Sequence, residues 1–498
     1  MEFVIKKVDW VSPHALFEIF RSDYASLLHS GKNGQYSILG LDPFLRIRSK
    51  NSDTEVFQND TVTHYSGDPL ILLREKISEM APKFRRDFFA DLPFIGGAMG
   101  YFSYDFGVTF ENIKQRVKDD LLTPDLFFVF PSKIFVFDHE KRQIYLLLYG
   151  QNRTALSQGL QAIEERLQSK TDDRYDDDLS IDRTLLRNFP VHYNVDRRRR
   201  THSKPLAQVA SDVLTRLQSK HIESNLTFPQ YLKKIGKIQE YLRKGETYQV
   251  NFSQRFCVDV DSDPFLIYKR ISTLNPSPFQ AYFEFPDIRI VSASPERLCR
   301  LYLSGKQWIV ETSPIKGTVL RGKTSQIDEE NRLKLLHSLK DRAELDMIVD
   351  LARNDIGRVC VHGSVRVTDH RRTEEYSHVW HTVSDVSGIL APQHDFVDVI
   401  RSAFPGGSIT GCPKKRTMEI IDELEDYKRG IYTGSCGYIG YDGAMDFNIM
   451  IRTIAFKDGK AYFQAGGGIV ADSEAEKEYQ ETLHKAAAMR ESILLASP

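Results

Sequence analysis

The stretch Glu311-Thr312-Ser313-Pro314-Ile315-Lys316-Gly317-Thr318 lies at the centre of the motifs from which the fold is predicted. Pro314 stiffens the approach to the lysine and has no backbone donor, while Gly317 allows a tight turn or the close approach of a ligand. Lys316 could therefore be held in one orientation. Burial disfavours the ammonium form, and a neutral lysine is a nucleophile. A solvated lysine in a loop is the alternative interpretation of this stretch alone.

Lys316 belongs to an ordered series of motifs that extends through the C-terminal half of the chain. The other motifs are Ser294-Pro295-Glu296-Arg297, Asp341-Arg342-Ala343-Glu344, Val349-Asp350-Leu351-Ala352-Arg353-Asn354-Asp355-Ile356-Gly357-Arg358, Phe404-Pro405-Gly406-Gly407-Ser408-Ile409-Thr410-Gly411, Ile451-Arg452-Thr453 and Gly466-Gly467-Gly468-Ile469-Val470-Ala471-Asp472-Ser473. The series resembles that of the chorismate-utilising enzymes, which include anthranilate synthase component I, aminodeoxychorismate synthase component I, isochorismate synthase and salicylate synthase. The resemblance runs from about Phe228, and a weaker similarity covers the N-terminal half.

Composition places the chain among ordinary globular proteins. Its 498 residues are 41% apolar and 27% charged, with a net charge of −1, so no overall field favours nucleic acid or an anionic membrane. No apolar run is long enough to span a bilayer, and the N-terminus lacks the apolar core of a signal peptide. The five cysteines form no CxxC pair and indicate a reducing compartment, so we expect a cytoplasmic protein.

The pattern of elements predicts an α+β fold because regular βαβ alternation is absent. We expect an N-terminal lobe over residues 1–150, a variable linker over 151–227 with an acidic cluster and a basic run, and a catalytic domain over 228–498. The resemblance adds two large, mainly antiparallel β-sheets that face each other with helices outside.

Several local elements are predicted from periodicity and turn residues. Thr227 is expected to cap a helix that ends near Gly245, and Gln249 to Phe256 alternate like a strand. A turn at Pro131-Ser132 is expected to separate two strands, and a turn at Asp442-Gly443 to form a hairpin. Residues Leu336, Leu339, Ala343, Met347, Ile348 and Leu351 recur at helical spacing and predict one helix with Glu344 toward its apolar face.

The resemblance implies a Mg²⁺ site. Glu344 and Glu481 match the family's metal carboxylates, and Asp341 and Glu478 match its outer carboxylates. From the residues alone, Glu344 would pair with a nearby arginine. Glu481 would form an ordinary surface pair with Lys485, four positions along the helix. Mg²⁺ prefers oxygen ligands and could hold the ring carboxylate of chorismate while the ring hydroxyl departs.

The resemblance also assigns the groups that contact the substrate. Arg452 would clasp a carboxylate through its planar fork, helped by Lys485 and the backbone N–H groups of Gly467 and Gly468. Glu296 matches the general acid that protonates the departing C4 hydroxyl, and such an acid needs a raised pKa. His381 matches the active-site histidine. An ion pair for Glu296 and a structural role for His381 are the alternatives that the residues alone leave open.

Two positions distinguish branches of the family. Isochorismate and salicylate synthases activate water with a lysine that aligns with Gln249, and a glutamine cannot act as a base. Anthranilate synthases have alanine where this chain has Lys316, beside Gly317 and Thr318. The lysine form resembles the aminodeoxychorismate synthases, in which it adds covalently to the ring before ammonia enters at C4. Because no glutaminase motif is present, ammonia is expected from solution or from a separate glutamine amidotransferase subunit.

A tryptophan pocket is a further expectation from the resemblance. Ser26-Leu27-Leu28-His29-Ser30 matches one side of the family's pocket, although His29 replaces the usual glutamate. The other side matches Asn275, Pro276, Ser277 and Phe279. Two alternative functions remain beside the amination hypothesis: that of anthranilate synthase component I, and that of a non-catalytic tryptophan-binding regulatory homologue. The glycines at 466–468 also fit a dinucleotide pattern, but the residues that follow are helical and lack its second strand.

Overall fold

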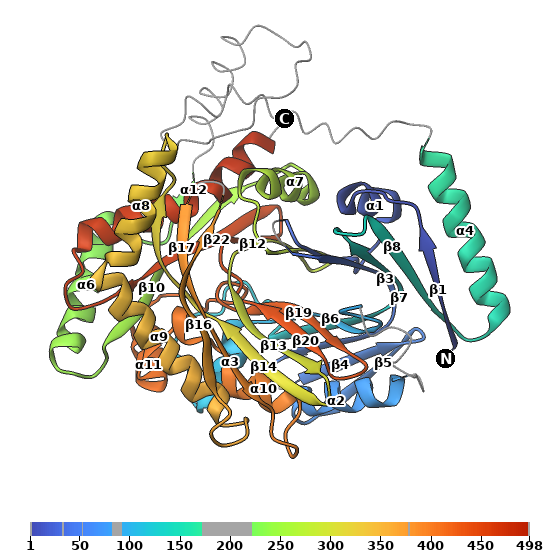
Figure 1. The fold of residues 1–498 in the computed structure, drawn as a ribbon, viewed down its shortest axis with the longest axis horizontal. Helices are drawn as coiled ribbons and strands as arrows, with labels where there is room; N and C mark the ends of the chain where they lie inside the picture. Colours follow the sequence, from blue (N-terminus) through green and yellow to red (C-terminus); the bar gives the residue numbers. More distant parts are fainter. Residues whose placement is uncertain are drawn as a thin grey trace, which may run out of the picture.

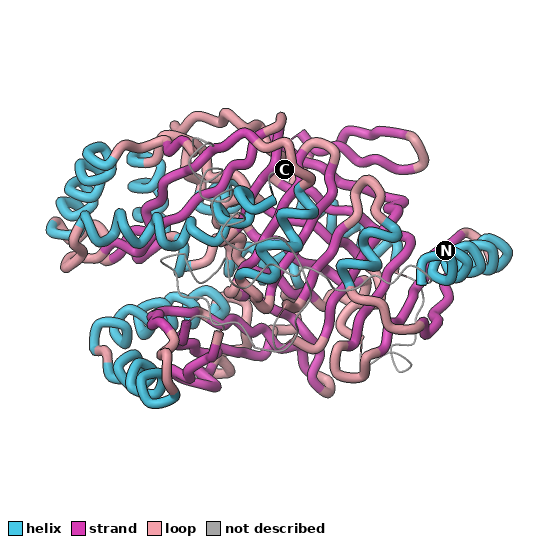
Figure 2. The backbone as a smooth tube through the Cα atoms, turned by 90° about the horizontal axis from the view of Figure 1, so that it is seen from above, coloured by secondary structure: helices cyan, strands magenta, loops and turns pink. Residues whose placement is uncertain are grey.

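Two antiparallel β-sheets face each other, with helices on their outer sides (Figure 1). The structure is a computed structural model and describes residues 2–31, 34–51, 53–81, 92–171, 222–376 and 379–496. Figure 2 shows strands running through the middle of the molecule, with helices at both ends of the view and others lying across the strands. All strand pairs between the named elements are antiparallel, which confirms the predicted fold class.

The first sheet contains strands from both halves of the chain. In spatial order they are β1 (Glu2–Val8), β8 (Gln143–Gly150), β7 (Leu126–Asp138), β3 (Tyr36–Lys50), β2 (Ser26–His29), β11 (Phe279–Phe285), β12 (Ile288–Ser294), β21 (Thr453–Lys457), β22 (Lys460–Ile469) and β10 (Gln249–Asp259). The short strands β9 (Glu223–Ser224) and β18 (Gly411–Cys412) lie beside β10.

The second sheet is also built from both halves. Its order is β5 (Thr61–Ser66), β4 (Asp53–Gln58), β3, β7, β6 (Gly97–Phe102), β19 (Ser435–Gly440), β20 (Met445–Asn448), β13 (Arg297–Ser304), β14 (Gln307–Ser313) and β17 (Val379–Ile389). Strand β15 (Ile315–Leu320) continues β14 along the same edge of β17, and β16 (Arg366–Glu375) pairs with the other edge.

Strands β3 and β7 join the two sheets because each passes from one sheet into the other. They cross at Pro43 and Pro131, which lie opposite each other where the register shifts. Proline has no N–H for the ladder, so the pairing is interrupted there and the strands can bend. The predicted turn at Pro131-Ser132 is therefore wrong: residues 126–138 form one strand, and the proline marks its crossing point.

Alternate side chains of β11 and β12 pack in two different cores. Phe283 and Ile290 join the cluster that contains Tyr101 and Phe127 of the second sheet. Tyr282, from the opposite face of β11, joins a cluster beneath helices of the first sheet. This period-two division is expected of a strand that is buried on both faces. It fixes the register of the strand that precedes Glu296.

Helices cover the outer faces of both sheets. Over the first sheet lie α1 (Pro13–Phe20), α4 (Arg153–Thr171), α6 (Phe228–Arg243), α7 (Pro264–Leu274) and α12 (Ala475–Ala496). Those associated with the second sheet are α2 (Pro69–Met80), α3 (Tyr104–Val108), α8 (Ser325–His337), α9 (Leu339–Gly357) and α10 (Phe396–Ala403). Helix α11 (Lys414–Leu424) packs against β10 and β18, and two single 3₁₀ turns are η2 (Thr109–Glu111) and η4 (Gly407–Ile409).

The local predictions are largely confirmed. Helix α6 begins after Thr227, which forms a capping box with Gln230, and Gly245 follows the helix with a φ of 71°. Strand β10 and the hairpin β19–β20 form as expected. The expected single helix around Glu344 is in fact two helices, because Ser338 ends α8 and caps α9. Leu339 is 80% exposed and therefore does not belong to the apolar face.

The predicted linker over residues 151–227 is described only at its two ends. Residues 153–171 form α4, which packs against β1 and β8 of the N-terminal lobe. The acidic cluster and the basic run lie outside the described residues. In the part of the chain that the structure describes, no helix is both long and apolar enough to cross a membrane.

Candidate active site

The predicted site residues gather where the chain passes between the two sheets. Glu296 lies between β12 of the first sheet and β13 of the second, and Arg452 lies between β20 of the second and β21 of the first. Gln249 begins β10 in the first sheet, whereas Lys316 and His381 are on β15 and β17 of the second. The site is therefore assembled from segments distant in sequence and depends on how the sheets are stacked.

Lys316 is directed by a β-bulge. The register between β15 and β17 shifts between Lys316 and Thr318, where Gly317 has a φ of 84°. Such a bulge re-aims the adjacent side chain, and glycine tolerates the positive φ. The carbonyl of Lys316 accepts a hydrogen bond from Thr382, and its Nζ lies 2.9 Å from Glu344 Oε2. The side chain is 21% exposed, so the solvated-loop alternative does not describe it.

Gln249 and Gly468 border the amine of Lys316. A methyl group built on Gly468 would lie 3.0 Å from Lys316 Nζ and 2.9 Å from the amide carbon of Gln249. Only a glycine leaves room for both side chains at this point on β22. The Gln249 side chain is fully buried, and neither its oxygen nor its nitrogen has a hydrogen-bond partner among the described residues. A buried amide without partners is costly, so this group is available to a ligand.

Glu296 has the environment of a carboxylic acid. It is 6% exposed, and burial raises its pKa to about 7, despite a hydrogen bond from Ser408 Oγ at 2.7 Å and one from the backbone of Ile315. The charges of Lys316 and Lys485 act in the opposite direction. The alternative, an ion pair with a cation such as the neighbouring Arg297, does not form with that residue, because its guanidinium binds Asp446 and Glu311. A carboxyl with this pKa can donate a proton near neutral pH.

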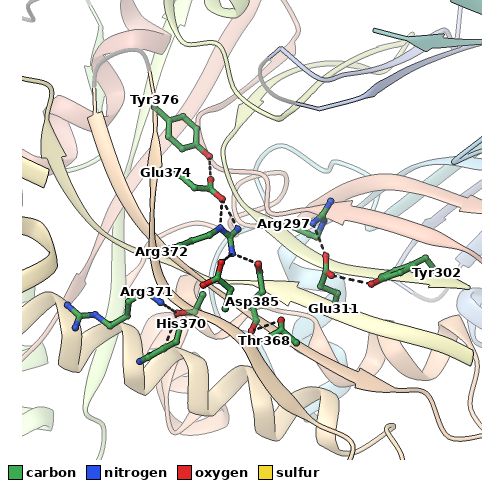
Figure 3. A network of polar contacts seen from close by, with 12 residues as sticks. Arg297, Tyr302, Glu311, Thr368, His370, Arg371, Arg372, Glu374, Tyr376 and Asp385 are labelled. Atoms are coloured by element: carbon green, nitrogen blue, oxygen red, sulfur yellow. Dashed lines mark hydrogen bonds and ion pairs between the residues drawn. The ribbon is translucent and has the colours of Figure 1, made fainter. Parts of the chain in front are cut away.

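His381 is held from both sides. Its Nδ1 lies 2.9 Å from Thr318 Oγ1, and its ring makes an edge contact with Tyr376 at 4.9 Å between centroids. Figure 3 shows the network that fixes this tyrosine: Tyr376 donates to Glu374, which pairs with Arg372, which in turn binds Asp385. The imidazole therefore has a fixed orientation next to the strand that carries Lys316.

Arg452 is placed to bind an anion. Its backbone has a φ of 51°, an uncommon conformation for an arginine, and its Nη1 donates to Asn275 Oδ1 at 3.1 Å. No carboxylate in the described part of the chain forms an ion pair with it, and burial lowers the pKa of the guanidinium. A half-buried guanidinium without a counter-ion attracts a carboxylate ligand.

The four predicted metal carboxylates come from two facing helices, α9 and α12. Glu344 lies beside Lys316 and Lys340, and Asp341 lies near Gly317. On the other helix, Glu478 and Glu481 are both close to Gly467, at 3.1 Å and 3.8 Å from a methyl group built there. The predicted pair between Glu481 and Lys485 forms at 2.7 Å, and Lys485 also donates to the carbonyl of Gly466 at 2.9 Å.

This donor set fits a hard divalent cation. In the described residues no three of these groups are already arranged as a metal cluster. Burial and the charge of Glu481 raise the pKa of Glu478, whereas Lys485, Lys316 and Lys340 lower that of Glu481. All the donors are carboxylate oxygens, the ligands that Mg²⁺ prefers. A cation there would relieve the repulsion between Glu478 and Glu481.

The two sides of the predicted tryptophan pocket are adjacent. Strand β2 pairs with β11, and Gly31, next to Ser30, donates its N–H to the carbonyl of Ser277 at 3.0 Å. Phe279 and Pro276 belong to the same segment as Asn275, the partner of Arg452. His29 packs edge to face against His14 and lies 3.3 Å from the hydroxyl of Tyr268. Burial lowers the pKa of His29 well below its ordinary value, so a neutral ring replaces the family's carboxylate.

Two functional contacts were not predicted from the sequence. Ser408 lies in the quoted glycine-rich motif, but nothing in that motif indicated a hydrogen bond to Glu296. The bond from Arg452 to Asn275 joins a predicted substrate residue to the predicted tryptophan pocket, although the two residues are far apart in sequence. Of these two contacts, only the one made by Ser408 had a signal in the sequence, the glycine-rich motif, and that motif did not indicate the hydrogen-bond partner of Ser408.

Comparisons with known proteins identify the family of this chain. The profile described as chorismate binding enzyme matches residues 24–491. The chain belongs to the chorismate binding enzyme family. Aminodeoxychorismate synthase component 1 of Bacillus subtilis is 38% identical over 94% of this chain and 92% of its own length. Anthranilate synthase component 1 of Acetivibrio thermocellus is 37% identical over 97% and 93%, respectively.

Solved structures in the chorismate binding enzyme family share the fold. Anthranilate synthase component I from Streptococcus pneumoniae superposes with a TM-score of 0.74 at 30% identity, covering 96% of this chain and 97% of its own. The menaquinone-specific isochorismate synthase of Escherichia coli has a TM-score of 0.67 at 15% identity, covering 99% of this chain and 95% of its own, a likeness of fold alone. The chain is therefore a chorismate-utilising enzyme, and its relatives include aminodeoxychorismate synthases component 1.

Proposed function

We propose that this enzyme aminates chorismate at C4 with ammonia and releases 4-amino-4-deoxychorismate, a precursor of 4-aminobenzoate and folate. The observation that carries the proposal is the position of Lys316. Its amine lies beside Gln249, Gly468 and Glu344, and its charge acts on the carboxyl of Glu296. An acid and a nucleophilic amine thus flank the space where a ring would bind.

The proposed reaction has two displacement steps. The amine of Lys316 gives up a proton to solvent and adds to ring carbon C2, the ring double bonds shift, and the C4 hydroxyl leaves as water with a proton from Glu296. Ammonia then adds to C4, the double bonds shift back, and Lys316 leaves as a free amine. The balance is chorismate plus ammonia to 4-amino-4-deoxychorismate plus water. Arg452 and Lys485 bind carboxylate groups and keep the ring in reach.

Magnesium is part of the proposal. Glu344 and Glu481 would hold the ion, with Asp341 and Glu478 as outer carboxylates, and Mg²⁺ would supply positive charge next to the ring carboxylate. Isosteric Glu344→Gln removes one anionic ligand and is expected to raise the Mg²⁺ concentration for half-maximal binding about tenfold or more. Isothermal titration with Mg²⁺ alone measures this, and Asp346→Asn on the same helix is the control. Unchanged Mg²⁺ affinity in Glu344→Gln would contradict the ligand assignment.

Ammonia is the proposed nucleophile because Gln249 cannot activate water. Its amide lacks partners among the described residues and can hydrogen-bond a ligand at the ring. The component 1 name of the relatives supports a separate glutamine amidotransferase subunit as the source of ammonia in the cell. Ammonium salts at raised pH would replace that subunit in an assay.

Lys316→Ala tests the covalent step. The variant removes the nucleophile, so we expect amination to fall by on the order of a hundredfold or more, with an unchanged fold by circular dichroism. Lys340→Ala is the control, because Lys340 also neighbours Glu344 but its side chain is 62% exposed. Mass spectrometry of the wild-type enzyme quenched with chorismate should show the adduct on the peptide that contains Lys316. Full activity of Lys316→Ala would exclude the covalent route.

Anthranilate synthase activity is the second candidate, favoured by the relative that is 37% identical. That enzyme would eliminate pyruvate and release fluorescent anthranilate. Incubation of the purified chain with chorismate, Mg²⁺ and ammonium separates the two products by chromatography. No turnover together with tight tryptophan binding would instead indicate a regulatory homologue. Tryptophan binding is itself part of the proposal, and calorimetry with Ser277→Ala as a pocket variant tests it.

A further inference from the structure

A small pocket, partly open to solvent, is lined in part by Glu296. Its volume is about 30 Å³, and it is lined by Glu296, Thr312 and Ser408 on one side and by Ala352 and Asp355 of α9 on the other. One water needs roughly 10–15 Å³ measured in this way, so two waters fit. The lining provides polar partners for both. Glu296 and Asp355 therefore line the same cavity.

Asp355 is a buried carboxylate that is only half satisfied. It is 4% exposed, and its Oδ2 accepts a hydrogen bond from Lys414 Nζ at 2.7 Å, a lysine that is 8% exposed. Its Oδ1 accepts no hydrogen bond from any described residue, and the nearest cation on that side, Arg358, is 4.0 Å away. A buried carboxylate oxygen normally has a donor, and an ordered water is the usual one where protein offers none.

We propose that two waters in this cavity join Asp355 to Glu296, and that Asp355 is thereby a positioning residue that keeps Glu296 protonated between turnovers. The water next to Glu296 accepts its O–H, and the water next to Asp355 donates to Oδ1. This arrangement stabilises the neutral acid, because the proton of Glu296 has an acceptor on the side away from the substrate. The inference rests on the proposed function, in which Glu296 is the general acid.

The charges around both carboxyl groups agree with this role. Lys316 and Lys485 face Glu296 from β15 and α12 and favour its ionised form. Lys414, Arg358 and Glu111 act on Asp355 from α11, the C-cap of α9 and η2. Lys414 Nζ pairs with Asp355 Oδ2 at 2.7 Å, so these two charges offset each other. Burial raises the pKa of Glu296.

Asp355→Asn is the first test. The variant leaves Lys414 uncompensated and removes the anionic acceptor, so the pKa of Glu296 should fall by on the order of one unit. Infrared titration of the free enzyme follows the carboxyl band that Glu296→Gln abolishes. The high-pH limb of kcat should shift by the same amount. Asp350→Asn is the matched control on the same helix, because its side chain is 72% exposed and pairs with Arg353. An unshifted band in Asp355→Asn overturns the inference.

A double variant tests the proposal in case Asp355→Asn alone does not fold. Asp355→Asn leaves a buried positive charge and risks instability, whereas Asp355→Asn combined with Lys414→Met removes the pair together. This double variant should fold and still lower the pKa of Glu296, by a smaller amount, because the acceptor is gone. Absence of any shift in the folded double variant contradicts the role of Asp355.

Ala352→Val distinguishes water from direct charge interaction. The larger side chain fills the cavity, so the effect of Asp355→Asn on the pKa of Glu296 should largely disappear in that background. An effect of equal size in the filled cavity would overturn the water link. If instead Glu296→Gln retains full amination, the general-acid assignment of the proposed function fails, while the infrared titration still reports whether Asp355 and Glu296 are coupled.

Discussion

At the residue scale, the buried carboxyl of Glu296, the proposed general acid, destabilises the folded chain where it is ionised. Its pKa is about 7 in the folded chain against 4.5 for an ordinary glutamate. As the pH rises, the carboxyl of Glu296 therefore ionises in the unfolded chain before it ionises in the folded chain. The resulting destabilisation of the folded chain is absent below about pH 4.5, grows between the two pKa values and reaches its full size above about pH 7. Glu296→Gln removes the ionisable proton and should raise the free energy of unfolding above pH 7 by up to about 3 kcal/mol. Amination should fall about a hundredfold or more.

Urea unfolding at about pH 8 and pH 5 measures the stability effect, which should shrink at the lower pH. Glu311→Gln, a carboxylate on β14 that pairs with Arg297, is the comparison variant. It removes an ion-pair partner and should not stabilise the chain. A stability difference for Glu296→Gln that is the same at both pH values would show that this carboxyl does not titrate near neutrality.

At the element scale, strand β22 leaves room for the Lys316 amine because position 468 lacks a side chain. Gly468→Ala would place a methyl group 3.0 Å from Lys316 Nζ and 2.9 Å from the Gln249 amide carbon. Both are ends of flexible side chains, so the strand should persist while the amine is displaced. We expect kcat to fall at least tenfold with a change in melting temperature of a few degrees. Activity assays and thermal unfolding of the same preparation provide both measurements.

Gly236→Ala is the control for this glycine substitution. Gly236 lies within α6, and a methyl group there meets nothing within 4 Å. Alanine in a helix interior is favoured over glycine by about 0.5–1 kcal/mol, so this variant should be slightly more stable and fully active. Equal activity of Gly468→Ala and the wild type would show that the Lys316 amine does not depend on the space beside β22.

At the scale of the whole molecule, the two halves of the chain form joint sheets. Strand β2 pairs with β11, and β6 pairs with β19, so each sheet crosses from one half to the other. Residues 222–498 expressed alone would expose those strand edges and the shared core. We expect this fragment to lack a cooperative thermal transition, whereas the full chain unfolds as one unit. Calorimetry and near-ultraviolet circular dichroism of both proteins test this, and a folded, active fragment would contradict it.

The sequence by itself determined the fold class and most of the local elements. Local features depend on residues that are close in the sequence and can therefore be predicted from it. Examples are the capping box at Thr227, the alternation of β10 and the position of Lys316 beside Gly317. Only the tertiary structure decided that β7 crosses between sheets at Pro131 and that Asn275 contacts Arg452. It likewise decided that Glu296 faces Ser408 and a cavity rather than Arg297. Burial and long-range pairing set these outcomes, because they arise from segments that meet only when the sheets stack.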